Sequence, residues 1–241
     1  MISHPGERPN VFASLARTIV SCERCPELRA YCALVAAEKK RAHRAEDYWG
    51  RPVPAFGDPQ ARVVLVGLAP GAHGSNRTGR MFTGDASGVW LYRALFRAGF
   101  ANQPDQRDRS DGLVLRDAFI TAALRCAPPG NKPTTVQLER CFPYLVAELD
   151  ALARLTVVVG LGAIGTRAAL RALEATGYRL ATPHRFTHLA ETPATHPERP
   201  PLALISSYHP SRQNTNTGVL TEPMLDAVFT RARALVDARS G

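Results

Sequence analysis

A short apolar run, Val63 to Val66, leads directly into a glycine-rich loop, and this junction constrains the fold more than any other stretch. Consecutive Val and Leu residues indicate a strand that is buried on both faces. Ligands of open α/β sheets bind beyond the carboxyl ends of the strands, so we expect a ligand site in the loop. The loop contains five glycines: Gly67, Gly71, Gly74, Gly79 and Gly84.

The polar residues of this loop favour an anionic ligand. Glycines allow backbone N–H groups to approach a ligand closely, and the loop adds cations and hydrogen-bond donors. One carboxylate remains for chemistry, and Ser87 is predicted to cap the helix that follows over residues 87–99. The polar side chains are those of His73, Asn76, Arg77, Arg80 and Asp85.

Apolar runs alternate with helical patterns through the rest of the chain. This alternation is typical of a mostly parallel sheet with helices on both faces. Residues 178–200 are predicted to be irregular, and residues 213–218 a polar loop. The predicted strands are residues 62–68, 118–124, 155–159 and 202–206, and the predicted helices include 12–20, 27–46, 163–175 and one that closes the chain.

We therefore predict a single α/β domain over residues 1–241. Residues 1–60 form a helical extension, and residues 61–241 form the α/β core with a four-stranded parallel sheet. No apolar run approaches the roughly 18–20 residues that a membrane span needs. The start of the chain has no secretory signal, so we expect a cytoplasmic, nucleoid-associated protein.

The net charge of the 241-residue chain is +9, and arginine supplies most of it. Arginine forks bind phosphate through two hydrogen bonds, so the charge favours a polyanionic partner. A genome rich in G and C would raise the arginine content in the same way. Charge alone therefore indicates nucleic acid only weakly.

The spacing of the cysteines favours a metal site. Cys22 and Cys25 form C-x₂-C, and Cys126 and Cys141 are more widely spaced. Four thiolates suit a tetrahedral metal or an iron–sulfur cluster, and the wide second pair favours the cluster over zinc. The alternative is four ordinary buried cysteines. We expect Cys32 to be a core thiol, and the C-x₂-C pair lacks the strand-to-helix setting of a redox motif.

Residues Gly160 to Gly165 match G-x-G-x-x-G directly after a strand. A dinucleotide fold also needs an acidic residue about 20 positions further on, and the chain has none there. We favour a tight strand-to-helix turn. His209 follows another strand, and a neutral imidazole there can donate a hydrogen bond to a developing anion. The alternative for His209 is a capping residue at a turn.

Taken together, these motifs resemble the uracil-DNA glycosylase superfamily, and most closely its family 5, the broad-specificity branch with an iron–sulfur cluster. The resemblance covers nearly the whole chain. It is carried by Cys22-x₂-Cys25, Gly67-Leu68-Ala69-Pro70-Gly71, Phe82 to Gly88, Cys126 to Pro133, Cys141, and His209-Pro210-Ser211.

The resemblance implies a four-stranded parallel sheet between helices and excision of a deaminated base from double-stranded DNA without strand cutting. It implies a structural 4Fe–4S cluster on Cys22, Cys25, Cys126 and Cys141. We expect a monomer, since one flipped base needs only one protein molecule.

The resemblance also assigns the chemistry. Other branches have a carboxylate or amide at the position of Ala69, and its absence shifts the expected positioning of water to Asp85, assisted by Asn131. The alternative is that Asp85 only caps the following helix. His209 is expected to stabilise the departing base, and Phe82 to stack on it, unless Phe82 is a core residue. The expected substrate-binding residues are Gly67, Ala69, Gly71, His73, Asn76 and Phe82.

Specificity and DNA contacts are further expectations. A related branch has a base-reading asparagine where this chain has Ala122, so discrimination should be relaxed and hypoxanthine should be a substrate beside uracil. The segment 212–218 is expected to enter the minor groove. Residues expected to contact DNA are Arg77, Arg80, Lys132, Ser211 and Arg212.

Two other functions remain open at this stage. One is a nucleotide- or dinucleotide-binding enzyme that uses Gly160 to Gly165. The other is a non-catalytic DNA-binding module with a cluster.

Overall fold

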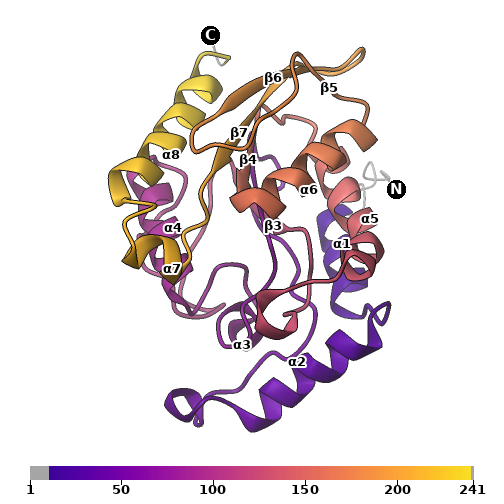
Figure 1. Cartoon of the computed structure of the whole chain (residues 1–241), viewed down its shortest axis with the longest axis vertical. Helices are drawn as coiled ribbons and strands as arrows, with labels where there is room; N and C mark the ends of the chain where they lie inside the picture. Colours follow the sequence, from indigo (N-terminus) through magenta and orange to yellow (C-terminus); the bar gives the residue numbers. More distant parts are fainter. Residues whose placement is uncertain (1–10, 240–241) are drawn as a thin grey trace, which may run out of the picture.

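The computed structural model describes residues 11–239 and contains one mixed sheet of seven strands (Figure 1). The strand order is β1-β3-β2-β4-β7-β6-β5. Four central strands run parallel and every residue in them is buried. They are β2 (Val63–Gly67), β3 (Ala118–Ala122), β4 (Val157–Leu161) and β7 (Leu202–Ser207). The four predicted strands are thus confirmed.

Three antiparallel strands extend the sheet at its edges, so the prediction of only four strands is wrong. β1 (Phe56–Gly57) pairs with β3, β6 (Glu191–Thr195) pairs with β7, and β5 (Arg179–Leu180) pairs with β6. The segment predicted to be irregular therefore contains β5 and β6. Pro193 lies inside β6, and the strand alternates between exposed and buried residues. A proline marks a segment as a poor strand candidate, and two-residue strands have no period to detect.

Helices cover both faces of the sheet (Figure 1). One face packs against α4 (Ala86–Arg97) and α8 (Glu222–Asp237). The other packs against α5 (Thr135–Ala151) and α6 (Gly162–Ala175), with α1 (Val11–Val20) beside α5. Thr134 caps α5 in a capping box with Gln137. Among residues 11–239, no helix is long and apolar enough to cross a membrane.

The N-terminal extension contains α1, α2 (Pro26–Glu38) and a short 3-10 turn, η1 (Arg41–His43). Its α2 part lies beyond the carboxyl ends of the central strands, whereas its first helix packs beside α5 (Figure 1). Figure 1 shows α2 next to α3 (Ser75–Thr78), a single turn inside the glycine-rich loop. The predicted helix 27–46 therefore ends early, at Glu38. Residues 1–10 of the predicted extension, where no secretory signal was found, lie outside the described residues.

Two further short elements follow strands. The loop after β3 contains the 3-10 turn η2 (Pro129–Asn131), and the segment after β7 contains α7 (Arg212–Asn216). The predicted polar loop 213–218 is thus largely helical. Ser211 caps α7 by accepting a hydrogen bond from the backbone of Asn214.

Candidate active site

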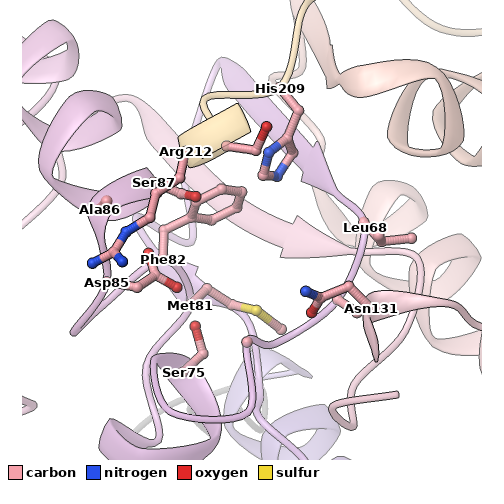
Figure 2. Close-up of a pocket in the computed structure, with 13 residues that line it drawn as sticks. Leu68, Ser75, Met81, Phe82, Asp85, Ala86, Ser87, Asn131, His209 and Arg212 are labelled. Atoms are coloured by element: carbon pink, nitrogen blue, oxygen red, sulfur yellow. The ribbon is translucent and has the colours of Figure 1, made fainter. Parts of the chain in front are cut away.

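A cavity of about 440 Å³ opens at the carboxyl edge of the central strands (Figure 2). Three loops form it, one each after β2, β3 and β7. The loop positions agree with the expectation that parallel strands direct their following loops to one edge. The lining residues are Leu68, Ala69, Gly71, Ser75, Met81, Phe82, Asp85, Ala86, Ser87, Asn131, His209, Ser211 and Arg212.

Asp85 both caps a helix and lines the cavity. It is the N-cap of α4, and its Oδ1 accepts a hydrogen bond of 3.0 Å from the backbone N–H of Gly88. The predicted cap, Ser87, lies within the first turn instead. Burial raises the pKa of the Asp85 carboxyl, although the amides of Gly88 and Ser87 act in the opposite direction. The capping role therefore does not withdraw this carboxylate from the cavity.

Glycines of the loop make room for this carboxylate. A Cβ atom on residue 74 would lie 2.3 Å from Asp85 Oδ2, and one on residue 71 would lie 3.0 Å from it. Side chains at either position would therefore collide with the carboxylate or press on it. Gly71 and Gly74, which seemed suited to approach a ligand, thus leave the space that the Asp85 carboxylate occupies.

Phe82 and His209 form one wall of the cavity. Their ring centroids are 5.8 Å apart, with an interplanar angle of 31°. The Phe82 ring lies against the end of β2, where a Cβ on Gly67 would come within 2.8 Å of the ring. Gly67 thus acts by supporting Phe82.

The His209 loop is fixed by its backbone. The carbonyl of His209 accepts hydrogen bonds from the Ser211 backbone at 2.8 Å and from Asn214 Nδ2 at 2.9 Å. Desolvation lowers the pKa of His209 to about 4. The imidazole is therefore neutral at neutral pH and can donate a single N–H into the cavity.

Asn131 approaches the cavity from the η2 turn, on the side away from Asp85 (Figure 2). Its backbone φ of 56° lies in the left-handed region, which asparagine tolerates better than most residues. The three loops thus bring a carboxylate, an amide and a neutral imidazole around one space. These are the residues that the sequence predicted to carry the chemistry.

Three predicted substrate-binding residues, Gly67, His73 and Asn76, do not line the cavity. Asn76 is fully buried, and its Nδ2 donates hydrogen bonds of 3.3 Å to the carbonyls of Cys32 and Ala72. It ties the glycine-rich loop to α2. His73 is exposed and lines a neighbouring cleft, where its Nδ1 lies 3.1 Å from the Tyr48 hydroxyl.

Arg77 and Arg80, which were predicted to contact DNA phosphates, are buried. Arg77 donates to the carbonyls of His73 and Gly84, both at 2.8 Å, and pairs with Glu46.

Arg80 binds Asp111 through two hydrogen bonds, of 2.8 and 2.6 Å. The glycine-rich loop has few side chains that can pack against one another. Arg77 and Arg80 therefore stabilise its conformation through these hydrogen bonds.

The other predicted DNA contacts remain at the surface. Lys132 and Arg212 are exposed. Arg212 stands at the mouth of the cavity beside Asp85 (Figure 2). The lining residues that were not predicted as site residues include Ser75 and Met81, which are both almost fully buried. Neither has a spacing in the sequence that distinguishes it from a core residue.

The four predicted cluster cysteines come together where the extension meets α5. They belong to one apolar cluster with Leu28, Leu124 and Tyr144. Among residues 11–239, no three His, Cys, Asp or Glu side chains are arranged to hold a single metal ion. The cysteines are free thiols, and burial raises the pKa of Cys141 to about 11. Cys32 is a buried thiol next to Cys126, as expected of a core residue.

The surroundings of Arg125 indicate whether the cysteine site fits an anionic group. Its side chain is 2% exposed and pairs with Glu148, which also accepts from the Thr121 hydroxyl at 2.6 Å. Two other donors of Arg125, Nε and Nη1, are buried and have no hydrogen-bond partner among the described residues. The positive charge of Arg125 opposes the effect of burial on the pKa of the Cys141 thiol. Because buried donors rarely lack acceptors, an anionic iron–sulfur group on the thiols fits this site.

The space next to the glycines of residues 160–165 is occupied by other residues of the protein. A Cβ on Gly165 would lie 2.4 Å from the carbonyl oxygen of Val66, and one on Gly160 would lie 2.4 Å from Thr166. A Cβ on Gly162 would meet that of His209 at 3.1 Å. These glycines let α6 pack closely on β2 and on the His209 loop. They are therefore a tight turn, as the sequence favoured, and leave no room for a pyrophosphate.

Comparison with known proteins identifies the family of the chain. The family model described as "Uracil DNA glycosylase superfamily" matches residues 54–233. A "Type-5 uracil-DNA glycosylase" from Thermus thermophilus is 47% identical over 222 residues, which cover 92% of this chain and 97% of the relative.

Two further relatives place the chain within that superfamily. A protein of the same name from Mycobacterium tuberculosis is 46% identical over 226 residues, covering 93% of this chain and 81% of the relative. A "Type-4 uracil-DNA glycosylase" from Archaeoglobus fulgidus is 32% identical over 149 residues, covering 61% and 58%. The resemblance inferred from the motifs is confirmed, and the chain belongs to the uracil DNA glycosylase superfamily.

Proposed function

We propose that this protein hydrolyses the N-glycosidic bond of uracil, and of other deaminated bases such as hypoxanthine, in double-stranded DNA. It leaves an abasic site and does not cut the strand. The observation that carries the proposal is the meeting of Asp85, Asn131 and His209 around one cavity next to Phe82. The names of the relatives point to the same activity.

The reaction separates two charges, and the cavity offers a group for each. As the glycosidic bond breaks, its electron pair goes to the base and the sugar gains oxocarbenium character. The Asp85 carboxylate stabilises that positive charge, orients a water molecule toward the sugar and accepts a proton from it. Asn131 faces Asp85 across the cavity and can hold the same water molecule.

His209 acts on the departing base. A neutral imidazole can donate its N–H to a base carbonyl oxygen on which negative charge develops. The lowered pKa of His209 keeps the ring neutral, so it donates a hydrogen bond and not a proton. A base in the duplex is out of reach, so the nucleotide must be flipped, at a cost of a few kcal/mol. Phe82 provides a surface on which the flipped base stacks.

The apolar character of the walls supports relaxed specificity. Leu68, Ala69, Met81 and Phe82 line the cavity, and Ala122 is buried at the end of β3. A pocket with few polar side chains to hydrogen-bond the base discriminates weakly, because a wrong base leaves few buried polar groups without a partner. We therefore propose hypoxanthine as a second substrate.

We further propose that Cys22, Cys25, Cys126 and Cys141 hold a 4Fe–4S cluster. The convergence of the four thiols and the two unpartnered donors of Arg125 support this. The bound cluster supplies a cross-link between the extension and α5. The cysteines thereby hold α2 against the glycine-rich loop, which Asn76 also ties to Cys32.

The activity is tested with labelled duplexes that carry one U·G, U·A or hypoxanthine·T pair. After incubation, one half of each sample is treated with alkali, which cleaves the strand at abasic sites. We expect cleavage at the modified base after alkali only, and none in an unmodified duplex. Binding without abasic sites would indicate a non-catalytic module, and a retained nucleotide without base release would indicate a nucleotide-binding enzyme.

A further inference from the structure

Two clefts adjoin the cavity and each other. The first, of about 480 Å³, is lined by Lys40 and His73 among others. The second, of about 710 Å³, is lined by Arg107. Both clefts share Asp85 and Arg212 with the cavity. The two clefts also share His43 and Gly84 with each other, so the three hollows are continuous and form one groove that includes the candidate active site.

Exposed cations line this groove. Lys40, Arg107 and Arg212 are all exposed, and none of them has a carboxylate within 4.0 Å among residues 11–239. The arginine in the same groove that is buried, Arg77, is by contrast already paired with Glu46. A cation without a partner beside a concave surface is available to bind an anion.

Lys40 is held in place on the groove. The φ of Lys39 is 53°, and this left-handed residue ends α2 and turns the chain toward the cavity. The backbone N–H of Lys40 donates to the Tyr48 hydroxyl at 3.3 Å, and the same hydroxyl contacts His73. Lys40 is thus fixed at its backbone, while its ammonium group remains free.

Within the part of the chain that the structure describes, the acidic side chains of the groove do not form ion pairs with Lys40, Arg107 or Arg212. Glu46 is engaged by both His43 and Arg77, and these partners lower the pKa of its carboxyl. Asp108 is exposed and accepts from Ser110, both backbone and side chain, at 2.7 Å. Asp85 faces the cavity, where Arg212 partly offsets its charge. The groove therefore presents three exposed cations, Lys40, Arg107 and Arg212, around the carboxylate of Asp85.

We propose that Lys40, Arg212 and Arg107 form a phosphate track for the DNA strand that carries the flipped nucleotide. Arg212 binds next to the flipped nucleotide, and Lys40 and Arg107 bind phosphates of the backbone further along the groove. The proposal rests on the proposed function, because it takes DNA as the anion. It assigns DNA contact to Lys40 and Arg107, in place of the buried Arg77 and Arg80.

The test is the salt dependence of DNA binding, measured by fluorescence anisotropy. The probe is a labelled duplex with one abasic-site analogue, so that binding is measured without base release. Each phosphate contact contributes about 0.9 to the slope of log affinity against log salt concentration. Lys40→Gln and Arg107→Gln should each reduce the slope by about 0.9, and the double variant by about twice as much.

The matched control is Arg171→Gln. Arg171 is an exposed arginine on α6 that pairs with Glu139 on α5, and neither residue lines the groove. The change removes one charge and should leave the slope unchanged. A wild-type slope in both groove variants would overturn the proposal, as would an equal reduction in the control. If Lys40→Gln lowers the melting temperature, Lys40→Arg should restore the slope, and its failure to do so would also overturn the track.

This outcome is separable from that of the base-release assay. If the salt dependence of DNA binding is reduced in the groove variants but no base is released, the proposed function is contradicted and the phosphate track is supported. Base release with unaltered slopes in both groove variants would do the reverse.

Discussion

Gly74 leaves open the space that the Asp85 carboxylate occupies, since a Cβ atom on residue 74 would lie 2.3 Å from Asp85 Oδ2. Gly74→Ala should therefore displace the carboxylate and reduce the single-turnover rate of base release by about 100-fold, because misplacement by about 1 Å has this effect. DNA affinity should change little, since residue 74 is buried.

The control for this variant is Gly218→Ala. Gly218 has a φ of 74°, yet a Cβ there would meet no atom within 4 Å. The substitution introduces backbone strain without touching the cavity, so the rate of base release should be retained. If Gly74→Ala keeps the wild-type rate, the position of Asp85 does not control the reaction.

The acid side of the pH–rate profile should belong to Asp85. Its carboxyl must be ionised to accept a proton from water, and burial raises its pKa above the ordinary value of 3.8. The rate should fall as pH drops through that raised pKa. Asp85→Asn should lower the rate by about 10²–10⁴-fold and abolish this side of the profile. A profile of unchanged shape in Asp85→Asn would show that another group titrates.

His209 should make the protein less stable in acid. Its folded-state pKa of about 4 lies below the ordinary value of 6.5, so the unfolded chain binds more protons between these values. Stability is complete above about pH 6.5 and declines as pH falls toward 4. At pH 5 the loss should be roughly 2 kcal/mol. Urea unfolding at pH 7 and 5 measures it, and His209→Gln should remove this part of the loss. An identical pH dependence in both proteins would contradict the buried, neutral imidazole.

Arg125→Gln should weaken the proposed cluster. The substitution removes the buried positive charge beside Cys141 and the two donors that lack acceptors. Iron and sulfide should be lost several-fold faster when the purified protein is exposed to a chelator, while Arg125→Lys should lose them at an intermediate rate because it keeps the charge. Visible absorbance follows the loss independently of base release. Equal rates of iron loss in the wild type and Arg125→Gln would show that the donors face no cluster.

The central sheet could be predicted because its four parallel strands are buried on both faces and therefore read as unbroken apolar runs. The same rule brought the right residues together, since Asp85, Asn131 and His209 each lie in a loop after such a strand. The edge strands were missed because Pro193 interrupts β6 and because β1 and β5 each have two residues.

The roles of Arg77 and Arg80 could not be predicted from their own loop. Each pairs with a carboxylate 31 positions away, Glu46 and Asp111 respectively, and such pairs leave no local pattern. Gly74 was interpreted as room for a ligand for the same reason, because its neighbour Asp85 is recognisable only once the loop is folded. Lys40 lies in the basic stretch Lys39-Lys40-Arg41 of the sequence, but its place beside the cavity depends on the turn at Lys39.

Single-turnover release of uracil from a labelled U·G duplex, by the wild type and by His209→Ala, tests the central claim most directly. One donor to a developing oxyanion contributes roughly 3–4 kcal/mol, so His209→Ala should be several hundred-fold slower at the same DNA saturation. A wild-type protein that releases neither uracil nor hypoxanthine, or a His209→Ala variant with the wild-type rate, would contradict the account.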